Sequence, residues 1–582
     1  LPICIFAVAS EGQRLKFARE QSNAYFAVLS LIHQRFPQNE RAVQSGLDLV
    51  LARKGVVFDA QARQNELLLK SSDADLAALM GELKKDRAWL AKMLQSKPDG
   101  MSYEDYQERL TGLREAIAAK EVEASSRSAL VAQHIGLKRV SSVEIGQLLK
   151  PDEALVEFVR IEDYDWTKAR WSGHHRYLAF VLRNVGPVRL VDLGDARKLD
   201  LVLQGALEKL VSGDGDVCAN IGAECRRPAE QGRSARLASK RNFKIARSSA
   251  GAAGVAGAQS LYSAIWMPLS ETVAQANSLI ISPDGLLNLV PFAAVQHPTG
   301  KFLVEDHIIS YVTSGRDLAK QETGVRAESE LFLAADPDFE KMPEARMQSG
   351  ARGSMRSSGF KFAFQRLPGT ALEAKLVATY FSGRKVVVTG ALATEMAVLS
   401  AARPRVMHLA THGFFLPDQL VDSAAGELGV QADSQMVRSG LAFAGANHAS
   451  KTLGSNDGLL TAVEVSSMDL HGTDLVILSA CESGVGEVQS GEGVFGLRRA
   501  FALAGARHLM MSLWPVGDEI TALQMNRFYK SYGQGEPPAL ALVMAQRESI
   551  KSLRGQTGFA DPSLWAPFIL QTSRLGMLAT ER

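Results

Sequence analysis

The chain has 582 residues, of which 46% are hydrophobic and 22% charged, and its formal net charge is +2. This length exceeds what one hydrophobic core supports and predicts about three domains. The near-neutral charge argues against a general electrostatic footprint for nucleic acid, so no direct nucleic-acid binding is expected. No apolar run approaches the roughly 18–20 residues that a membrane span needs, and we expect no membrane association.

Four cysteines in so long a chain indicate a reducing compartment, and we expect a cytoplasmic protein: Cys4, Cys218, Cys225 and Cys481. Cys218 and Cys225 have no nearby pair of histidines, so a zinc site is not expected there. We predict neither a metal nor a cofactor. The chain begins at Leu1 rather than at a methionine, which is typical of a fragment or a processed product.

Residues 1–137 carry only helical patterns. One helical face repeats at the spacing of 4, 3 and 4 residues, and it consists of Tyr106, Leu110, Leu113 and Ile117. An earlier face has the same character, with Leu76, Leu79, Met80, Leu83, Leu90 and Met93. We interpret both faces as packing surfaces. No clean 34-residue repeat is present, so periodicity by itself does not establish a helical repeat array.

The pattern changes from about residue 138. Short strand-like runs occur at 154–159, 177–182, 188–191 and 279–282. Residues 212–258 between them are rich in Gly, Ala, Ser and Arg, and such a composition predicts a long mobile insertion. A second stretch of this kind, residues 340–361, is expected to be a solvated loop.

Residues 331–577 alternate strands and helices. Strands are predicted at 331–335, 385–388, 406–410, 475–480 and 508–514. Helices are predicted at 369–381, 395–400, 493–503 and 519–529. This alternation predicts an α/β fold with a mostly parallel sheet that helices cover on both faces.

His412 and Cys481 each follow one of these strands directly and precede a small or Gly-rich turn. Ligands of open parallel sheets bind at the carboxyl ends of the strands. An imidazole beside a thiol raises its thiolate fraction, which makes a nucleophile with its own base. The N–H groups of Gly413 and Cys481 are the natural donors for an oxyanion. Alternatively, Cys481 is an inert buried cysteine and His412 a turn histidine with a hydrogen-bond partner.

Two other motifs are weaker. His408 precedes His412 by the spacing that suits a helical metal pair, but this run reads as a strand, where such residues lie too far apart. We therefore expect His408 to be a core residue with a hydrogen-bond partner. Residues 491–496 match GxGxxG, yet the motif does not lie directly at the turn between strand and helix, so nucleotide binding is not expected. This loop is predicted to shape a substrate cleft beside Cys481.

At these residues the chain resembles the CHAT family of caspase-like cysteine peptidases, which is related to separase. The resemblance covers roughly residues 140–577 and rests on six segments: 281–292 (ISPDGLLNLVPF), 367–370 (LPGT), 408–413 (HLATHG), 456–460 (NDGLL), 478–484 (LSACESG) and 512–516 (SLWPV).

The resemblance implies a caspase-like sheet built from an inactive half, residues 138–325, and a catalytic half, residues 326–577. Residues 1–137 would be the end of an upstream helical array of tetratricopeptide type. His412 would be the general base, Cys481 the nucleophile, and Gly413 with Cys481 the oxyanion hole. No third orienting residue is evident, so we predict a dyad.

The substrate pocket is predicted to include Ser479, Trp514 and Asp518. Caspase-like enzymes that prefer Arg or Lys often carry an acid two residues before the cysteine, where this chain has Ser479. Asp518 is similar to an acidic position of separases, and its carboxylate could pair with an Arg side chain. Alternatively, Asp518 is the N-cap of the helix at 519–529.

The main hypothesis is a cysteine endopeptidase that cleaves a protein substrate through an acyl-thioester. We expect regulation by the helical region, through an activating protein or nucleoprotein partner. The alternative is a non-catalytic caspase-like scaffold that only binds partners. The basic residues of 226–247 or 346–361 are predicted sites of self-cleavage.

Overall fold

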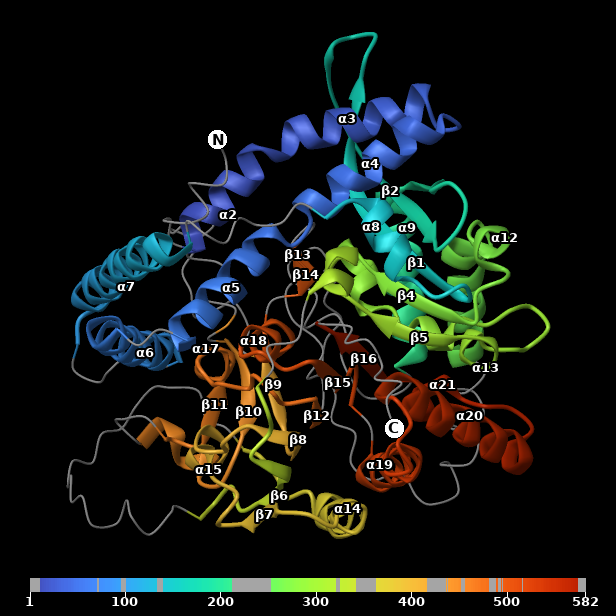
Figure 1. The fold of residues 1–582 in the computed structure, drawn as a ribbon. Helices are drawn as coiled ribbons and strands as arrows, with labels where there is room; N and C mark the ends of the chain where they lie inside the picture. Colours follow the sequence, from blue (N-terminus) through green and yellow to red (C-terminus); the bar gives the residue numbers. More distant parts are fainter. Residues whose placement is uncertain are drawn as a thin grey trace.

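The computed structural model describes residues 11–70, 73–95, 101–132, 140–211, 253–320, 325–341, 363–415, 436, 438–451, 456–480, 488–489, 493–494, 496–515 and 517–573 (Figure 1). The predicted insertion at 212–258 lies outside these residues except for its last six, and those six are helical rather than part of a loop. Most of the stretch 340–361 also lies outside them.

Among the described residues, helices are the only regular elements before β1, as predicted for residues 1–137. They are α2 (Glu11–Glu20), α3 (Ser22–Arg35), α4 (Glu40–Arg53), α5 (Val56–Lys70), α6 (Ala74–Gln95), α7 (Tyr103–Ala132) and α8 (Ser142–Leu148). The two predicted apolar faces meet between α6 and α7, where Leu83, Leu90, Tyr106 and Leu110 share one cluster. The two helices are packing partners because each presents one apolar stripe that only burial against a neighbour can hide from water.

One sheet of eleven strands follows, in the spatial order β3-β2-β1-β4-β5-β16-β15-β12-β8-β6-β7. The first five strands along the chain are β1 (Glu153–Asp165), β2 (Arg170–Arg183), β3 (Arg189–Asp195), β4 (Ser278–Ser282) and β5 (Ile308–Tyr311). The other six are β6 (Ser329–Pro337), β7 (Lys385–Gly390), β8 (Pro404–Ala410), β12 (Leu475–Ser479), β15 (His508–Ser512) and β16 (Phe568–Thr572). Two small sheets consist of β9 (Gly413–Phe415), β10 (Ser439–Ala442) and β11 (Leu459–Thr461), and of β13 (Val488–Gln489) and β14 (Gly493–Val494).

Further α-helices are α9 (Ala196–Leu210), α12 (Ser270–Val273), α13 (Leu303–Asp306), α14 (Pro368–Ala378), α15 (Glu395–Leu399), α17 (Ala462–Ser466), α18 (Leu497–Leu503), α19 (Asp518–Tyr532), α20 (Pro538–Thr557) and α21 (Pro562–Trp565). Short 3-10 turns include η2 (Gly285–Leu289). The predicted class, a mostly parallel sheet flanked by helices after an all-α region, is confirmed. The inner strands, such as β12 and β16, are buried on both faces, which is why they occur in the sequence as short apolar runs. The edge strands β3 and β7 are partly exposed.

Three expectations need correction. The helix predicted from Gly493 begins at Leu497, and Gly493–Val494 forms β14 instead. The helix predicted at 519–529 begins at Asp518 with Gly517 as its N-cap, so the N-cap role weighed for Asp518 is wrong. Finally, β5 and β16 were not expected. β16 is antiparallel to β15 and parallel to β5, and it joins the two groups of strands into one sheet.

A buried lysine anchors the helical region to the first part of the sheet. Lys54, between α4 and α5, is 3% exposed. Its Nζ lies 2.8 Å from Glu157 Oε1, 2.8 Å from the Phe158 carbonyl and 2.7 Å from Ser282 Oγ. Burying an ammonium is costly unless it is paired and hydrogen-bonded, and here both conditions hold. The carboxyl end of β4 is thereby occupied by a side chain of the helical region.

Candidate active site

The ends of β8 and β12 lie side by side. The two strands are parallel, and their register pairs Ala410 with Ser479, the last residue of each strand. His412 follows β8 by two residues, and Cys481 follows β12 by two residues. Cys481 lies outside the described residues, so its separation from His412 stays a prediction.

The ring of His412 is held by three neighbours from two other segments. Its Nε2 lies 2.7 Å from the carbonyl oxygen of Gln365. The ring stacks on Phe364 at 5.5 Å between centroids and meets Phe339 at 5.4 Å. A carbonyl oxygen can only accept a hydrogen bond, so Nε2 carries the proton and donates. In the neutral imidazole this leaves Nδ1 as the basic nitrogen.

Gln365 is thus a group that sequence reasoning missed. Its contribution is a backbone carbonyl, which carries no side-chain signature and can belong to any residue type. The carbonyl of Gln365 therefore adds a hydrogen-bond acceptor for His412 to the predicted dyad. The segment that supplies it, residues 363–367, leads directly into α14.

The amide of Gly413 points away from its neighbouring strand. The N–H of Ala442 donates to the His412 carbonyl at 2.9 Å, and Gly413 is the next residue, opposite Leu441 in the antiparallel pair β9–β10. Hydrogen-bonded and non-hydrogen-bonded pairs alternate along such strands. The N–H of Gly413 therefore points out of the small sheet, and its role as an oxyanion donor stays a prediction.

His408 is a buried core residue with a hydrogen-bond partner, as predicted. Its side chain is fully buried, and Nδ1 lies 3.0 Å from the hydroxyl of Tyr529. Nε2 lies 2.9 Å from Glu373 Oε1, at ion-pair distance although without the alignment of a hydrogen bond. Burial raises the pKa of Tyr529 well above its usual value, so this hydroxyl keeps its proton.

The three predicted pocket residues differ in surroundings. Ser479 is buried, and its hydroxyl donates to Glu373 Oε2 at 3.1 Å. Trp514 is 3% exposed, and its Nε1 donates to the Ser563 carbonyl at 3.1 Å. Asp518 is the first residue of α19, but its side chain lies outside the described residues. Their roles toward a substrate stay predictions.

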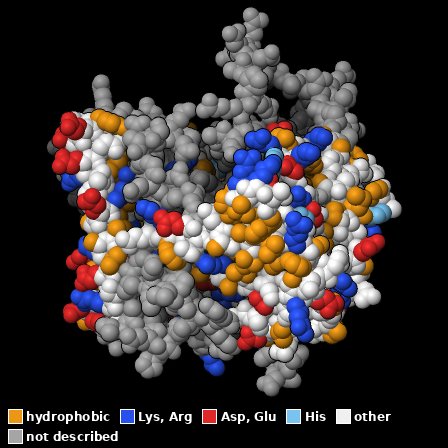
Figure 2. All heavy atoms as spheres, turned by 90° about the horizontal axis from the view of Figure 1, so that it is seen from above, with side chains coloured by type: hydrophobic (Ala, Val, Ile, Leu, Met, Phe, Trp, Pro, Cys, Tyr) orange, Lys and Arg blue, Asp and Glu red, His pale blue; other side chains and the backbone are white. Residues whose placement is uncertain are grey.

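No cluster of three or more potential metal ligands occurs among the described residues, and Cys218 and Cys225 lie outside them. In the GxGxxG match, residues 491, 492 and 495 lie outside the described residues as well. Across the part of the chain that the structure describes, every helix is too short or too polar to cross a membrane. Figure 2 shows basic, acidic and apolar side chains interspersed over one face of the molecule.

The fold and the site define an α/β protein with an oriented histidine at the carboxyl end of a central strand, beside the end of a parallel neighbour. Residues 255–573, more than half of the chain, match the CHAT domain. The protein belongs to the CHAT domain family.

Among curated proteins, the chain is similar to human tetratricopeptide repeat protein 28, with 28% identity over 328 residues, which is 52% of this chain and 12% of that protein. The mouse protein of the same name is 27% identical over 331 residues, again 52% of this chain and 12% of the relative. The match therefore spans only a small part of these relatives.

Among solved structures, the separase–securin complex of Saccharomyces cerevisiae is similar with a TM-score of 0.43 and 9% identity, over 97% of this chain and 40% of that chain. Gingipain R, an Arg-specific cysteine proteinase, is similar with a TM-score of 0.31 and 8% identity, over 55% of this chain and 67% of that chain.

Proposed function

We propose that this protein is a cysteine endopeptidase whose base is His412 and whose nucleophile is Cys481. The observation that carries the proposal is the orientation of His412. Its Nε2 proton is bound by the Gln365 carbonyl, and the end of β8 lies beside the end of the strand that leads to Cys481. A nucleophile, its base and a group that orients the base are the recurring parts of such sites.

The reaction begins when the Cys481 thiol transfers its proton to Nδ1 of His412. The thiolate attacks the carbonyl carbon of the scissile peptide bond, and the N–H groups of Gly413 and Cys481 stabilise the oxyanion. When the tetrahedral intermediate collapses, the C–N bond breaks and His412 returns the proton to the leaving amine. Water then attacks the acyl-thioester with His412 again as base, which releases the acid and restores the thiol.

Cleavage of a peptide library derived from a proteome tests this function. We expect wild-type protein to cleave and the Cys481→Ala and His412→Ala variants to be inactive while remaining folded. Iodoacetamide gives a second readout, because a poised thiolate at Cys481 reacts faster near neutral pH than Cys4, Cys218 or Cys225. Equal cleavage by wild type and Cys481→Ala, with four equal alkylation rates, would instead favour the non-catalytic scaffold.

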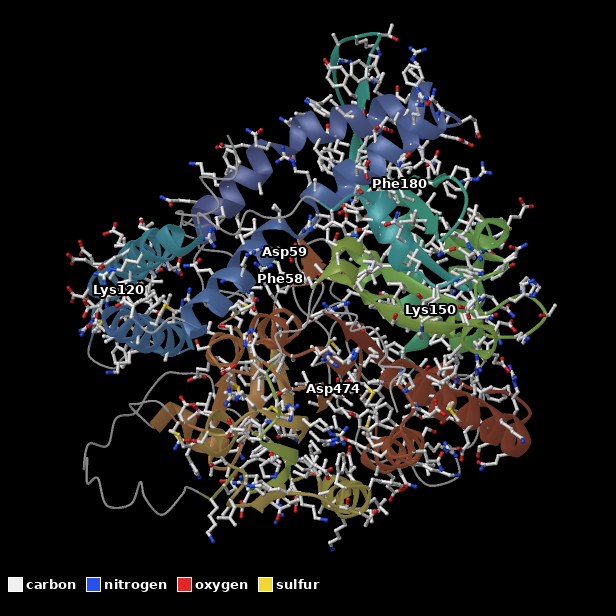
Figure 3. All side chains as sticks on the ribbon, in the orientation of Figure 1. Phe58, Asp59, Lys120, Lys150, Phe180 and Asp474 are labelled. Atoms are coloured by element: carbon white, nitrogen blue, oxygen red, sulfur yellow. The ribbon has the colours of Figure 1, made fainter. Side chains whose placement is uncertain are left out.

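Regulation by the helical region is part of the proposal, and two contacts support it. On α5, Gln61 accepts a hydrogen bond from Arg499 of α18 at 3.1 Å, and the Phe58 ring lies 5.3 Å from that guanidinium. Figure 3 shows Phe58 and Asp59 on α5. The second contact is Val463 of α17, which packs on the α6–α7 cluster.

The two helices that receive these contacts, α17 and α18, lie before and after Cys481 in the sequence. α17 precedes β12, and α18 follows the segment that contains Cys481. An activating protein or nucleoprotein that shifts α5 or α6 would therefore act on the two helices that flank the nucleophile in sequence. The predicted self-cleavage sites at 226–247 and 346–361 lie outside the described residues, and self-cleavage remains a proposal.

A further inference from the structure

A buried carboxylate lies beneath the ends of the two strands that lead to His412 and Cys481. Glu373 of α14 is 1% exposed. Its Oε2 accepts a hydrogen bond from Ser479 of β12 at 3.1 Å, and its Oε1 lies 2.9 Å from Nε2 of His408 of β8. One side chain thus contacts both strands.

The surroundings make this carboxylate unusual. On the same face of the sheet, the neighbours of His408 and Ser479 along their strands are apolar: Val406, Ala410, Leu475 and Ile477. A carboxylate placed in such a layer is costly unless each oxygen is engaged, and replacing the whole group by apolar side chains is often neutral or stabilising. Stability alone therefore does not explain why three polar groups meet here.

The segment that leads into the helix of Glu373 also contacts His412. Residues 363–367 lead into α14, and within them Gln365 supplies the carbonyl that accepts from His412 Nε2 at 2.7 Å. One short stretch of the chain therefore contacts the His412 ring, through Gln365 before α14, and the strand before Cys481, through Glu373 within α14.

Resting on the proposed function, we propose that Glu373 is a positioning residue that fixes the end of β12 relative to the end of β8. It thereby sets the approach of Cys481 to Nδ1 of His412. The carboxylate acts through Ser479 and His408 and does not contact substrate, since it is buried, with Oε2 hydrogen-bonded to Ser479 and Oε1 at ion-pair distance from His408.

The test compares two replacements of Glu373 with a matched control. Glu373→Met keeps the length but removes both acceptors, whereas Glu373→Gln keeps an oxygen that can accept from Ser479. Val377→Ala is the control, because Val377 lies one turn farther along the same face of α14, is fully buried and belongs to an apolar cluster. All rates are normalised to the folded fraction from near-UV circular dichroism.

We expect Glu373→Met to lower kcat about 100-fold with little change in KM, since a misplacement of about 1 Å can cost that factor. The kcat of Glu373→Gln should be at least tenfold higher than that of Glu373→Met. The kcat of Val377→Ala should stay within about threefold of the wild-type value. Combining Ser479→Ala with Glu373→Met should add little, because both remove the same contact. The inference would be overturned by equal kcat values for Glu373→Met and Val377→Ala. Equal losses of kcat in Glu373→Met and Glu373→Gln would overturn it as well.

The pH dependence of Cys481 alkylation separates this inference from the proposed function. If wild type cleaves nothing, the peptidase proposal fails, but the profile still reports how closely His412 approaches the thiol. A profile that shifts to higher pH in Glu373→Met and not in Val377→Ala supports the positioning role. Identical profiles in all variants would refute that role even if wild type were an active peptidase.

Discussion

Replacing Lys54 by Met should destabilise the protein strongly, because it leaves Glu157 as a buried carboxylate without its cation. Lys54 is 3% exposed and Glu157 is fully buried. Removing one partner of such a pair typically costs about 3–5 kcal/mol. In this case Glu157 keeps two donors, Ser282 Oγ at 2.6 Å and the Gly315 N–H at 2.7 Å. We therefore expect the lower end of that range, about 3 kcal/mol.

Guanidinium unfolding followed by circular dichroism measures this loss. The matched control is Lys168→Met, since Lys168 is 63% exposed in its side chain and lies 3.5 Å from Asp165. Such a surface pair contributes little to stability, because water screens it. In the double variant Lys54→Met with Glu157→Gln, a neutral amide replaces the stranded charge and should recover about half of the loss. Equal losses for Lys54→Met and Lys168→Met would refute the reasoning, because burial would then have no energetic consequence.

Three further predictions concern the site, pH and the contact with the helical region. Phe364→Ala should lower kcat about tenfold, because the His412 ring loses the face that it stacks on; an unchanged kcat in a steady-state peptide assay would contradict this. Burial lowers the pKa of His508 to about 4. As the pH falls, His508 is therefore protonated in the unfolded state before it is protonated in the folded state. Stability should therefore fall by about 2 kcal/mol as pH drops from 6.5 to 4, and His508→Asn should flatten this part of a pH series of unfolding midpoints. Arg499→Met removes the cation from the Phe58 ring and should alter cleavage rate more than the unfolding midpoint; a change in midpoint alone would mean that this contact is only structural.

Local patterns were sufficient to predict the strands that carry the site. β8 and β12 are short apolar runs that end at small residues, and their burial on both faces produces that pattern. The burial of His408 followed from the same pattern, since a histidine inside a buried strand needs a polar partner. The identity of that partner did not follow, because Glu373 lies on a different element and its segment reads as an ordinary helix.

What the sequence could not predict depends on contacts between distant segments or on backbone atoms. The Gln365 carbonyl orients His412 with an atom that every residue possesses. β16 joins the strand β5, whose residues precede it by more than two hundred and fifty positions. Pairing of this kind is chosen by the packing of the whole sheet rather than by propensity, so a short apolar run near the C-terminus gives no sign of its neighbour.

The proposed boundary at residue 325 divides the sequence, but the sheet is continuous across it. β5 precedes the boundary and pairs with β16, which follows it. Arg498 of α18 is buried and donates to the Asn288 carbonyl of η2 at 3.2 Å, and burial lowers its pKa to about 10. Across the same junction, Arg554 of α20 pairs with Glu305 at 2.6 Å. A protein that starts at residue 326 would lose these partners and expose the edge of β16 that faces β5.

We expect that shortened protein to aggregate on expression, whereas the full chain with Cys481→Ala stays soluble, because exposed hydrophobic edges template association. Size-exclusion chromatography of the two proteins at equal concentration makes the comparison. A monomeric shortened protein with the unfolding midpoint of the full chain would show that the catalytic half folds alone. In that case the first half would be dispensable for building the site, and its contacts with α18 would serve only to regulate it.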